Sequence, residues 1–390
     1  MGSCVPHPRR RATVAGAALL NACLGSLYAW SIFVEPLRAE FGWSATEVSW
    51  VFAVSLAVFC AVTVTAGRLA DRASPRLLAL IATACAGLGM LGSAATTSLW
   101  WLLICYAGVF GVGNGLGYVT AVTAAGRAFP DRRGTAVGIA VAGYALGPLL
   151  IAVPGLAIID AVGWRRAFLL LAAALVTGML LAAHLLGGRG PAGTSRSTGR
   201  GIPPAEMLRR REAYLLWLVF ACGSFTGLMS VGHAAPVALE RGLSQPQASA
   251  AVSALAGCNA VGRLLAGPLS DRYGRGKALV GTMAACVSGA GLIGLTSGAG
   301  NALLAMGVVG LSYGGLAALV PAATADLFGE AHFGANFGLV FSAWGVGGLL
   351  GPVVGGWAAG LGGYSLAYLV GAALATVGLC TVGALVRGRV

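Results

Sequence analysis

Long uncharged apolar segments dominate the sequence and restrict what the chain can fold into. They lie at 13–34, 48–67, 77–98, 99–126, 134–159, 167–188, 213–239 and 244–268, followed by two longer runs at 278–325 and 333–386. A helix needs about 20 apolar residues to cross the ~30 Å hydrocarbon core of a bilayer. The two longer runs divide at 297–301 and 360–365, so twelve spans are expected. Each is predicted to be a helix, because backbone groups in lipid must be satisfied within their own segment.

The composition agrees with this pattern. Only 9% of the 390 residues are charged and 57% are hydrophobic, whereas about 25% are charged in soluble domains. This excludes an ordinary soluble globule and a disordered chain. The 62 glycines show no three-residue period, which excludes collagen. The predicted fold class is therefore an all-α polytopic membrane protein.

The basic residues indicate how the chain is oriented. There are 25 Lys and Arg against 12 Asp and Glu. With the N-terminus inside, 20 of the basic residues lie on the cytoplasmic side, four lie outside and one, Arg263, lies within a span. This bias predicts a multi-pass protein of the cytoplasmic (inner) membrane with both termini in the cytoplasm, and it excludes nucleic acid as the reason for the +13 charge.

The spans divide into two sets of six. We expect a cytoplasmic N-terminus at 1–12, an N-terminal six-helix bundle at 13–188, a cytoplasmic linker at 189–212 and a C-terminal six-helix bundle at 213–387. The linker is short and rich in arginine, and it carries no soluble domain.

Two motifs occur at equivalent places in both halves. After the second span the chain reads Gly67-Arg-Leu-Ala-Asp71-Arg72, and after the eighth it reads Gly267-Pro-Leu-Ser-Asp271-Arg272. Gly-Pro pairs likewise lie in the fifth and eleventh spans. The halves therefore read as parallel repeats.

With this loop present twice, the chain resembles the major facilitator superfamily over nearly its whole length. The resemblance implies that Asp71, Arg72, Asp271 and Arg272 latch a cytoplasmic gate. The alternative is surface charge that only orients the loops.

Finer motifs narrow the resemblance. They read Tyr28-Ala-Trp30-Ser31, Gly113-Asn114-Gly115-Leu-Gly117-Tyr118, Asn259-Ala-Val-Gly-Arg263 and Ser312-Tyr313-Gly-Gly. Together they are similar to the oxalate:formate antiporter family and the related bacterial monocarboxylate transporters.

Arg263 is the main candidate for substrate binding. A charge at this depth usually faces a cavity and has a partner, and a guanidinium fits a carboxylate through two hydrogen bonds. The alternative is snorkelling towards the cytoplasm, where Asp271 lies eight residues further on. In the resembled family the matching Arg binds the substrate carboxylate.

The remaining pocket candidates follow from the resemblance. Tyr118 and Tyr313 match positions where the family places phenolic hydroxyls near the substrate. Tyr28, Trp30 and Trp344 are aromatics of central spans, although Tyr and Trp are also common at membrane interfaces. Asn114 and Asn259 are expected to bind either ligand or neighbouring helices.

Two differences from the resembled family reduce the range of expected substrates and coupling mechanisms. Oxalate exchangers carry a Lys in the eleventh span, where this chain reads Phe341-Ser-Ala-Trp344-Gly. A single buried cation favours a monocarboxylate such as lactate, pyruvate or formate. Animal monocarboxylate transporters pair the matching Arg with an Asp one turn earlier, and here that position is Asn259, which puts their proton-coupling arrangement in doubt.

His233 is the proton-coupling candidate, and its alternative role is a neutral hydrogen bond between helices. The nine cysteines contain no CxxC pair, so no disulfide framework, metal or cofactor is expected.

The sequence thus predicts a secondary transporter whose partners are the lipid bilayer, a small carboxylate and protons, with no nucleic acid, and which functions as a monomer. An exporter of drugs or hydrophobic compounds is the alternative, although the first span lacks a buried acid. A non-transporting sensor and a membrane enzyme are less consistent with the sequence, because no signalling domain and no catalytic cluster is apparent.

Overall fold

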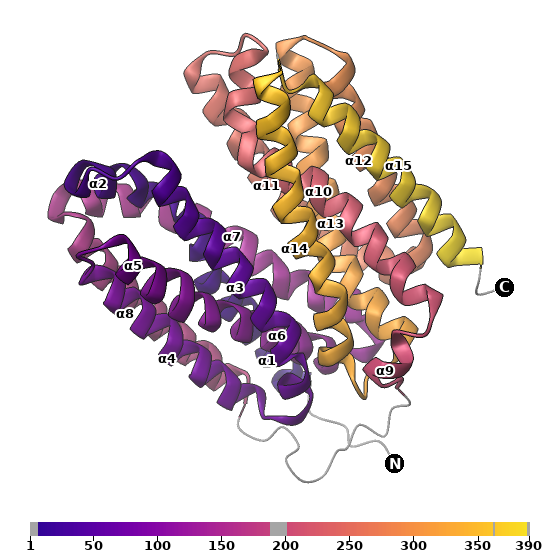
Figure 1. Cartoon of the computed structure of the whole chain (residues 1–390). Coiled ribbons are helices and arrows are strands. Elements are labelled where there is room, and N and C mark those ends of the chain that lie inside the picture. Colours follow the sequence, from indigo (N-terminus) through magenta and orange to yellow (C-terminus); the bar gives the residue numbers. More distant parts are fainter. Residues whose placement is uncertain (1–6, 188–200, 362, 388–390) are drawn as a thin grey trace. The chain divides into compact units, whose positions relative to one another are not determined.

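The computed structural model describes residues 7–187, 201–361 and 363–387. Residues 1–6 of the expected N-terminus and 189–200 of the expected linker lie outside this part of the chain. The described residues are almost entirely helical (Figure 1). The helices are α1 (His7–Leu24), η1 (Gly25–Ala29), α2 (Ser31–Phe41), α3 (Ala45–Arg72), α4 (Pro75–Ala94), α5 (Leu99–Leu102), η2 (Leu103–Phe110), α6 (Gly111–Ala128), η3 (Pro130–Arg132), α7 (Arg133–Val162), α8 (Trp164–Leu185), α9 (Pro204–Met207), α10 (Arg211–Glu240), α11 (Gln245–Tyr273), α12 (Arg275–Leu295), α13 (Ala299–Phe328), α14 (Phe333–Gly360) and α15 (Ser365–Arg387).

Eleven helical segments within the described residues are long and apolar enough to cross a membrane. They match every expected span except the fifth. That span corresponds to α7, which is 30 residues long and has no charged residue between Arg133 and Asp160. Several side chains of α7 lie outside the described set. The predicted all-helical membrane architecture is confirmed.

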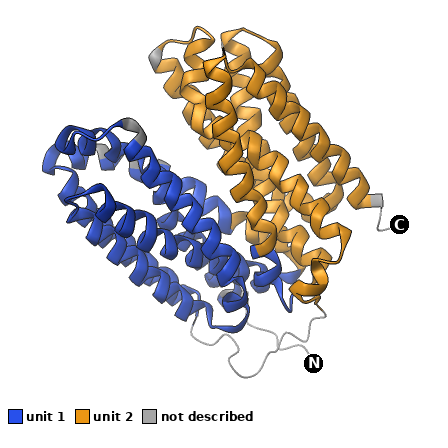
Figure 2. Ribbon diagram, viewed as in Figure 1, with its two compact units in different colours: residues 1–130, 140–200, 330–338 blue, residues 131–139, 201–329, 339–390 orange. Residues whose placement is uncertain are grey.

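The chain forms two compact units (Figure 2). Unit 1 comprises residues 1–130, 140–200 and 330–338, and unit 2 comprises 131–139, 201–329 and 339–390. The first residues of α7 therefore belong to unit 2, and the first residues of α14 belong to unit 1. Each unit is described by itself below.

The first span is not one continuous helix, which corrects the expectation for 13–34. α1 ends at Leu24, a 3₁₀ turn covers Gly25–Ala29, and α2 continues to Phe41. Adjacent Gly25 and Ser26 are the kind of pair at which helices break. The carbonyl of Leu24 is satisfied by the side chain of Asn114 instead, at 3.1 Å.

The fourth span also departs from a regular α-helix. Residues Leu103–Phe110 form a π-helical segment between α5 and α6. Such segments are rare and often occur at functional sites. Apolar periodicity does not distinguish π from α hydrogen bonding, so the sequence pattern contains no signal for it.

Two helices of the repeat begin in the same way. At the start of α3, Ser44 and Glu47 form a capping box, and Ser244 and Gln247 form the equivalent box at the start of α11. Each box satisfies donors that the first helical turn would otherwise leave unpaired. The shared cap is consistent with two related halves.

The core of each unit surrounds one buried helix. α6 packs against α1, α3 and α4 in unit 1, and α13 packs against α10, α11 and α12 in unit 2. Small residues bring α11 and α13 very close: a Cβ at Gly314 would overlap the backbone carbonyl of Asn259, and one at Gly262 would overlap that of Leu311. Close approach through small residues is the usual packing mode of membrane helices.

The expected linker contains structure near its end. The Gly201 backbone bridges to Gly329, and the amide of Ile202 donates to the carbonyl of Phe328 at 2.8 Å. The short helix α9 follows, and α10 begins at Arg211 rather than at 213. Residues 201–210 are therefore attached to the end of α13 in unit 2.

Candidate functional site

Arg263 lies on α11 and is buried in unit 2, with 4% of its surface exposed. Its Nε donates a 2.9 Å hydrogen bond to Oδ1 of Asn259, one helical turn earlier, where the i,i+4 spacing places both side chains on one face. The side chain thus extends away from Asp271, unlike the snorkelling alternative. This bond orients the guanidinium, uses one of its five N–H donors and introduces no negative charge.

Tyr313 and Trp344 form a second buried pair in unit 2. The indole Nε1 of Trp344 donates to the hydroxyl of Tyr313 at 2.8 Å. Phe341 stacks on the Trp344 ring, with 5.1 Å between centroids. The phenol oxygen of Tyr313 is thus the acceptor in this bond. Gly314 on α13 lies against the backbone of Asn259 on α11. Tyr313, the residue before Gly314, is therefore close to Asn259 along the contact between these two helices.

In unit 1 the polar candidates gather around Tyr144, a residue that the sequence analysis missed. Its hydroxyl donates to Oδ1 of Asn114 at 2.7 Å. Tyr28 and Tyr118 both meet the Tyr144 ring edge-on, at 5.3 and 5.6 Å between centroids. Asn114 therefore connects helices here. The only sequence signal for Tyr144 was its place in the Gly-Tyr-Ala-Leu-Gly-Pro motif of the fifth span.

Trp30 packs in a different part of unit 1. Its ring lies 4.5 Å from that of Tyr106 and 6.5 Å from that of Phe33. The ring contacts of Trp30 are therefore different from those of Tyr28 and Tyr118, which both pack against Tyr144.

His233 forms a contact between helices. Its Nε2 lies 2.9 Å from the carbonyl oxygen of Pro352 on α14, and its ring centroid is 5.2 Å from that of Tyr364. This is the geometry of the inter-helix alternative.

Asp71 binds the beginning of a helix within unit 1. Its carboxylate accepts the backbone N–H groups of Gly334 and Ala335 in the first turn of α14, at 2.7 and 2.9 Å. It also accepts from Arg127 at 2.7 Å. A carboxylate at a helix N-terminus satisfies unpaired donors and complements the helix dipole.

Asp271 forms the equivalent contact within unit 2. It accepts the backbone N–H groups of Gly134 and Thr135 in the first turn of α7, at 3.1 and 2.7 Å. Arg275 contacts the same carboxylate at 2.7 Å and also reaches Asp326 at 2.8 Å. The two motif aspartates thus have matching environments.

The arginines next to these aspartates are placed differently. Arg72 and Arg272 are exposed, and the guanidinium of Arg272 lies over the ring of Tyr273 at 5.3 Å. The ion-pair partners of the aspartates are Arg127 and Arg275, which the sequence analysis did not select. Arg275 had a detectable signal, its i,i+4 spacing from Asp271.

Within the described residues, no group of three or more His, Cys, Asp or Glu side chains could hold a metal ion.

Comparisons with known proteins place these features in a family. The family model for the Major Facilitator Superfamily matches residues 14–308 and 224–389. The oxalate:formate antiporter of Oxalobacter formigenes is 27% identical over 364 residues, covering 90% of this chain and 86% of that protein. Human monocarboxylate transporter 11 is 31% identical over 362 residues, covering 88% of this chain and 75% of that protein.

A solved structure has the same fold. The crystal structure of the transporter FucP in the outward conformation matches with a TM-score of 0.77 and 16% identity, covering 97% of this chain and 98% of that chain. Together with two related helical halves and matching motif aspartates, these comparisons show that the chain belongs to the Major Facilitator Superfamily.

Proposed function

We propose that this protein is a secondary active transporter that moves a small monocarboxylate across the cytoplasmic membrane by alternating access. The relatives named as an oxalate:formate antiporter and a monocarboxylate transporter support a carboxylate substrate. The observation that carries the proposal is Arg263, a buried guanidinium oriented by the neutral side chain of Asn259. Such a group binds a carboxylate through paired charge-assisted hydrogen bonds.

The α14 side of the site supports one negative charge rather than two. Where oxalate exchangers carry a Lys, this chain has residues 341–345, and Trp344 there is bonded to Tyr313. A dianion would bring a second charge without a matching cation, which is costly in a buried site. We therefore assign lactate, pyruvate or formate as the substrate class, with Tyr313 and Tyr118 as hydroxyl donors.

Proton symport follows from the same balance of charge, since one proton compensates one carboxylate. His233 is the titratable candidate, and His233→Gln preserves a donor for the Pro352 carbonyl while removing the titration. If the mutant keeps pH-dependent uptake, another group carries the proton.

The motif aspartates form part of the proposed transport cycle. Because Asp71 and Asp271 each hold the first turn of a long helix, we assign them to the cytoplasmic gate, with the two six-helix bundles at 13–188 and 213–387 as the moving parts. The cytoplasmic location of both termini rests on the charge bias of the loops.

Counterflow in proteoliposomes tests the substrate and Arg263 together. Lactate, pyruvate, formate and oxalate are compared in the wild type, Arg263→Gln, Arg263→Lys and the exposed control Arg209→Gln. We expect exchange of monocarboxylates in the wild type and the control, loss in Arg263→Gln and partial activity in Arg263→Lys, because Lys keeps the charge but not the planar fork. Failure of every monocarboxylate, or full activity in Arg263→Gln, contradicts the proposal.

A further inference from the structure

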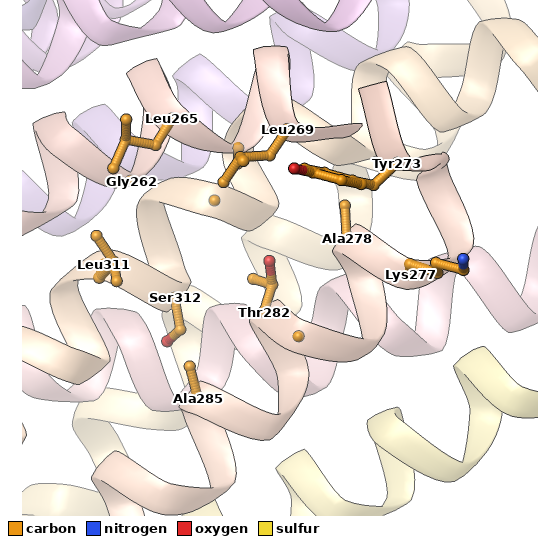
Figure 3. Close-up of a pocket in the computed structure, with 13 residues that line it drawn as sticks. Gly262, Leu265, Leu269, Tyr273, Lys277, Ala278, Thr282, Ala285, Leu311 and Ser312 are labelled. Carbon is orange, nitrogen blue, oxygen red and sulfur yellow. The ribbon is translucent and has the colours of Figure 1, made fainter. Parts of the chain in front are cut away.

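A groove of about 320 Å³ lies among α11, α12 and α13 of unit 2 (Figure 3). Leu265, Leu269 and Tyr273 follow one another along α11 and form one wall, and they are 51%, 48% and 55% exposed. The opposite side is formed by α12, where small residues leave space: a Cβ at Gly281 would meet no heavy atom within 4 Å. The groove is therefore mostly apolar and open to the surroundings.

The shape suits an extended hydrocarbon chain. From Gly262 to Tyr273 the wall covers 12 residues of helix, which rise about 16 Å at 1.5 Å per residue. This matches about half of a ~30 Å hydrocarbon core, which is the depth of one leaflet. Tyr273 lies at the end of α11, and tyrosine is typical of the boundary between hydrocarbon and headgroups.

The boundary end of the groove is positively charged. Lys277, the only lysine of the chain, is among the lining residues, and none of those lining residues is Asp or Glu. The exposed guanidinium of Arg272 lies over Tyr273 beside it. The neighbouring acid, Asp271, is already bound by Arg275 and by the start of α7. An anionic group at this end would meet positive charge.

The geometry points to a binding site for one anionic phospholipid in this groove, with an acyl chain between α11 and α12 and the phosphate at Lys277. The lining also includes Gly262 and Ser312, which directly precede Arg263 and Tyr313 in the sequence. A bound lipid would therefore contact α11 and α13 one residue away from these proposed substrate-binding positions. The site is independent of which substrate is carried.

Native mass spectrometry of the purified full-length chain tests this site without measuring transport. Phosphatidylglycerol and phosphatidylcholine with identical acyl chains are added separately in detergent. We expect one tightly retained phosphatidylglycerol in the wild type and weaker retention of phosphatidylcholine. Lys277→Gln should reduce phosphatidylglycerol retention about fivefold, the worth of one lysine near an anionic lipid surface, and Lys277→Arg should restore it.

Two matched controls make the result specific. Gly281→Leu fills the groove and should lower retention of both lipids. Gly291→Leu makes the same change elsewhere on α12, where a Cβ also meets nothing within 4 Å, and should leave retention unchanged. Arg76→Gln removes an exposed charge from the equivalent loop of the other repeat and should have no effect. Equal retention of the two lipids by the wild type, or unchanged retention in Lys277→Gln and Gly281→Leu, overturns the proposal. A dimer that Gly281→Leu abolishes would instead identify the groove as a protein interface.

Discussion

The hydrogen bond between Asn259 and Arg263 predicts how substrate affinity responds to charge at one position. The Nε–Oδ1 distance is 2.9 Å and both side chains are buried. Asn259→Ala removes one hydrogen bond to a charged group, worth about 1.5–3 kcal/mol. Because each 1.4 kcal/mol is about tenfold, and the guanidinium loses the bond that orients it, we expect substrate binding to weaken by roughly 10- to 100-fold.

Asn259→Asp is the sharper perturbation because it changes charge with little change of shape. A carboxylate about 4 Å from a guanidinium gains about 4 kcal/mol at an effective dielectric of 20. The introduced carboxylate therefore competes with the substrate for Arg263, and at neutral pH we expect affinity to fall by roughly two to three orders of magnitude. Arg263 keeps this carboxyl ionised in the free protein, whereas a bound substrate anion occupies Arg263 and favours the protonated form of the carboxyl. Binding then takes up a proton, so affinity should increase by up to about tenfold for each unit by which the pH is lowered.

The assay is equilibrium binding of radiolabelled lactate or pyruvate to purified protein from pH 5 to 8. The wild type, Asn259→Ala, Asn259→Asp and the exposed control Asn301→Asp are compared. The diagnostic result is a steep loss of affinity with rising pH in Asn259→Asp that Asn259→Ala lacks. Wild-type affinity in Asn259→Asp at pH 8 would refute the role assigned to Arg263.

Three further predictions concern other contacts. Asp71→Asn removes the negative charge at the first turn of α14, whose interaction with the helix dipole is worth about 0.3–2 kcal/mol. We expect a lower melting temperature and an altered transport rate. An unchanged transport rate at normal expression would exclude the latch. Trp344→Phe leaves the Tyr313 hydroxyl without its 2.8 Å donor, and we expect KM to rise by about two- to tenfold for a neutral hydrogen bond. Gly314→Ala places a methyl group against a backbone carbonyl and should destabilise unit 2 by about 1–3 kcal/mol in thermal unfolding, whereas Gly300→Ala, which has open space at its Cβ, should not.

Several features of the fold were predictable from the sequence because they depend on local composition. Span length follows from bilayer thickness, and the repeated aspartate loops reveal the two halves. Arg263 stood out because charge is rare within a span. These signals need no knowledge of which helices meet.

The breaks in helical structure inside the spans could not be predicted from the sequence. The side chain of Asn114 supports the 3₁₀ turn at Gly25–Ala29. It donates a hydrogen bond to the carbonyl of Leu24, which lies 90 residues earlier in the chain. Hydropathy reports only that the segment is apolar, so it cannot show which carbonyls are satisfied by distant side chains.

The sequence by itself determined the membrane-spanning helical character, the repeat and the position of one intramembrane cation, since these follow from the order of apolar and charged residues. Only the tertiary structure decided the partners. Asp71 accepts a hydrogen bond from the N–H of Gly334, which lies 263 residues later in the chain. Trp344 donates a hydrogen bond to Tyr313, and a groove lies beside Gly281. The physical reason is that hydrogen bonds and cavities depend on distances between helices, and a linear pattern does not contain those distances.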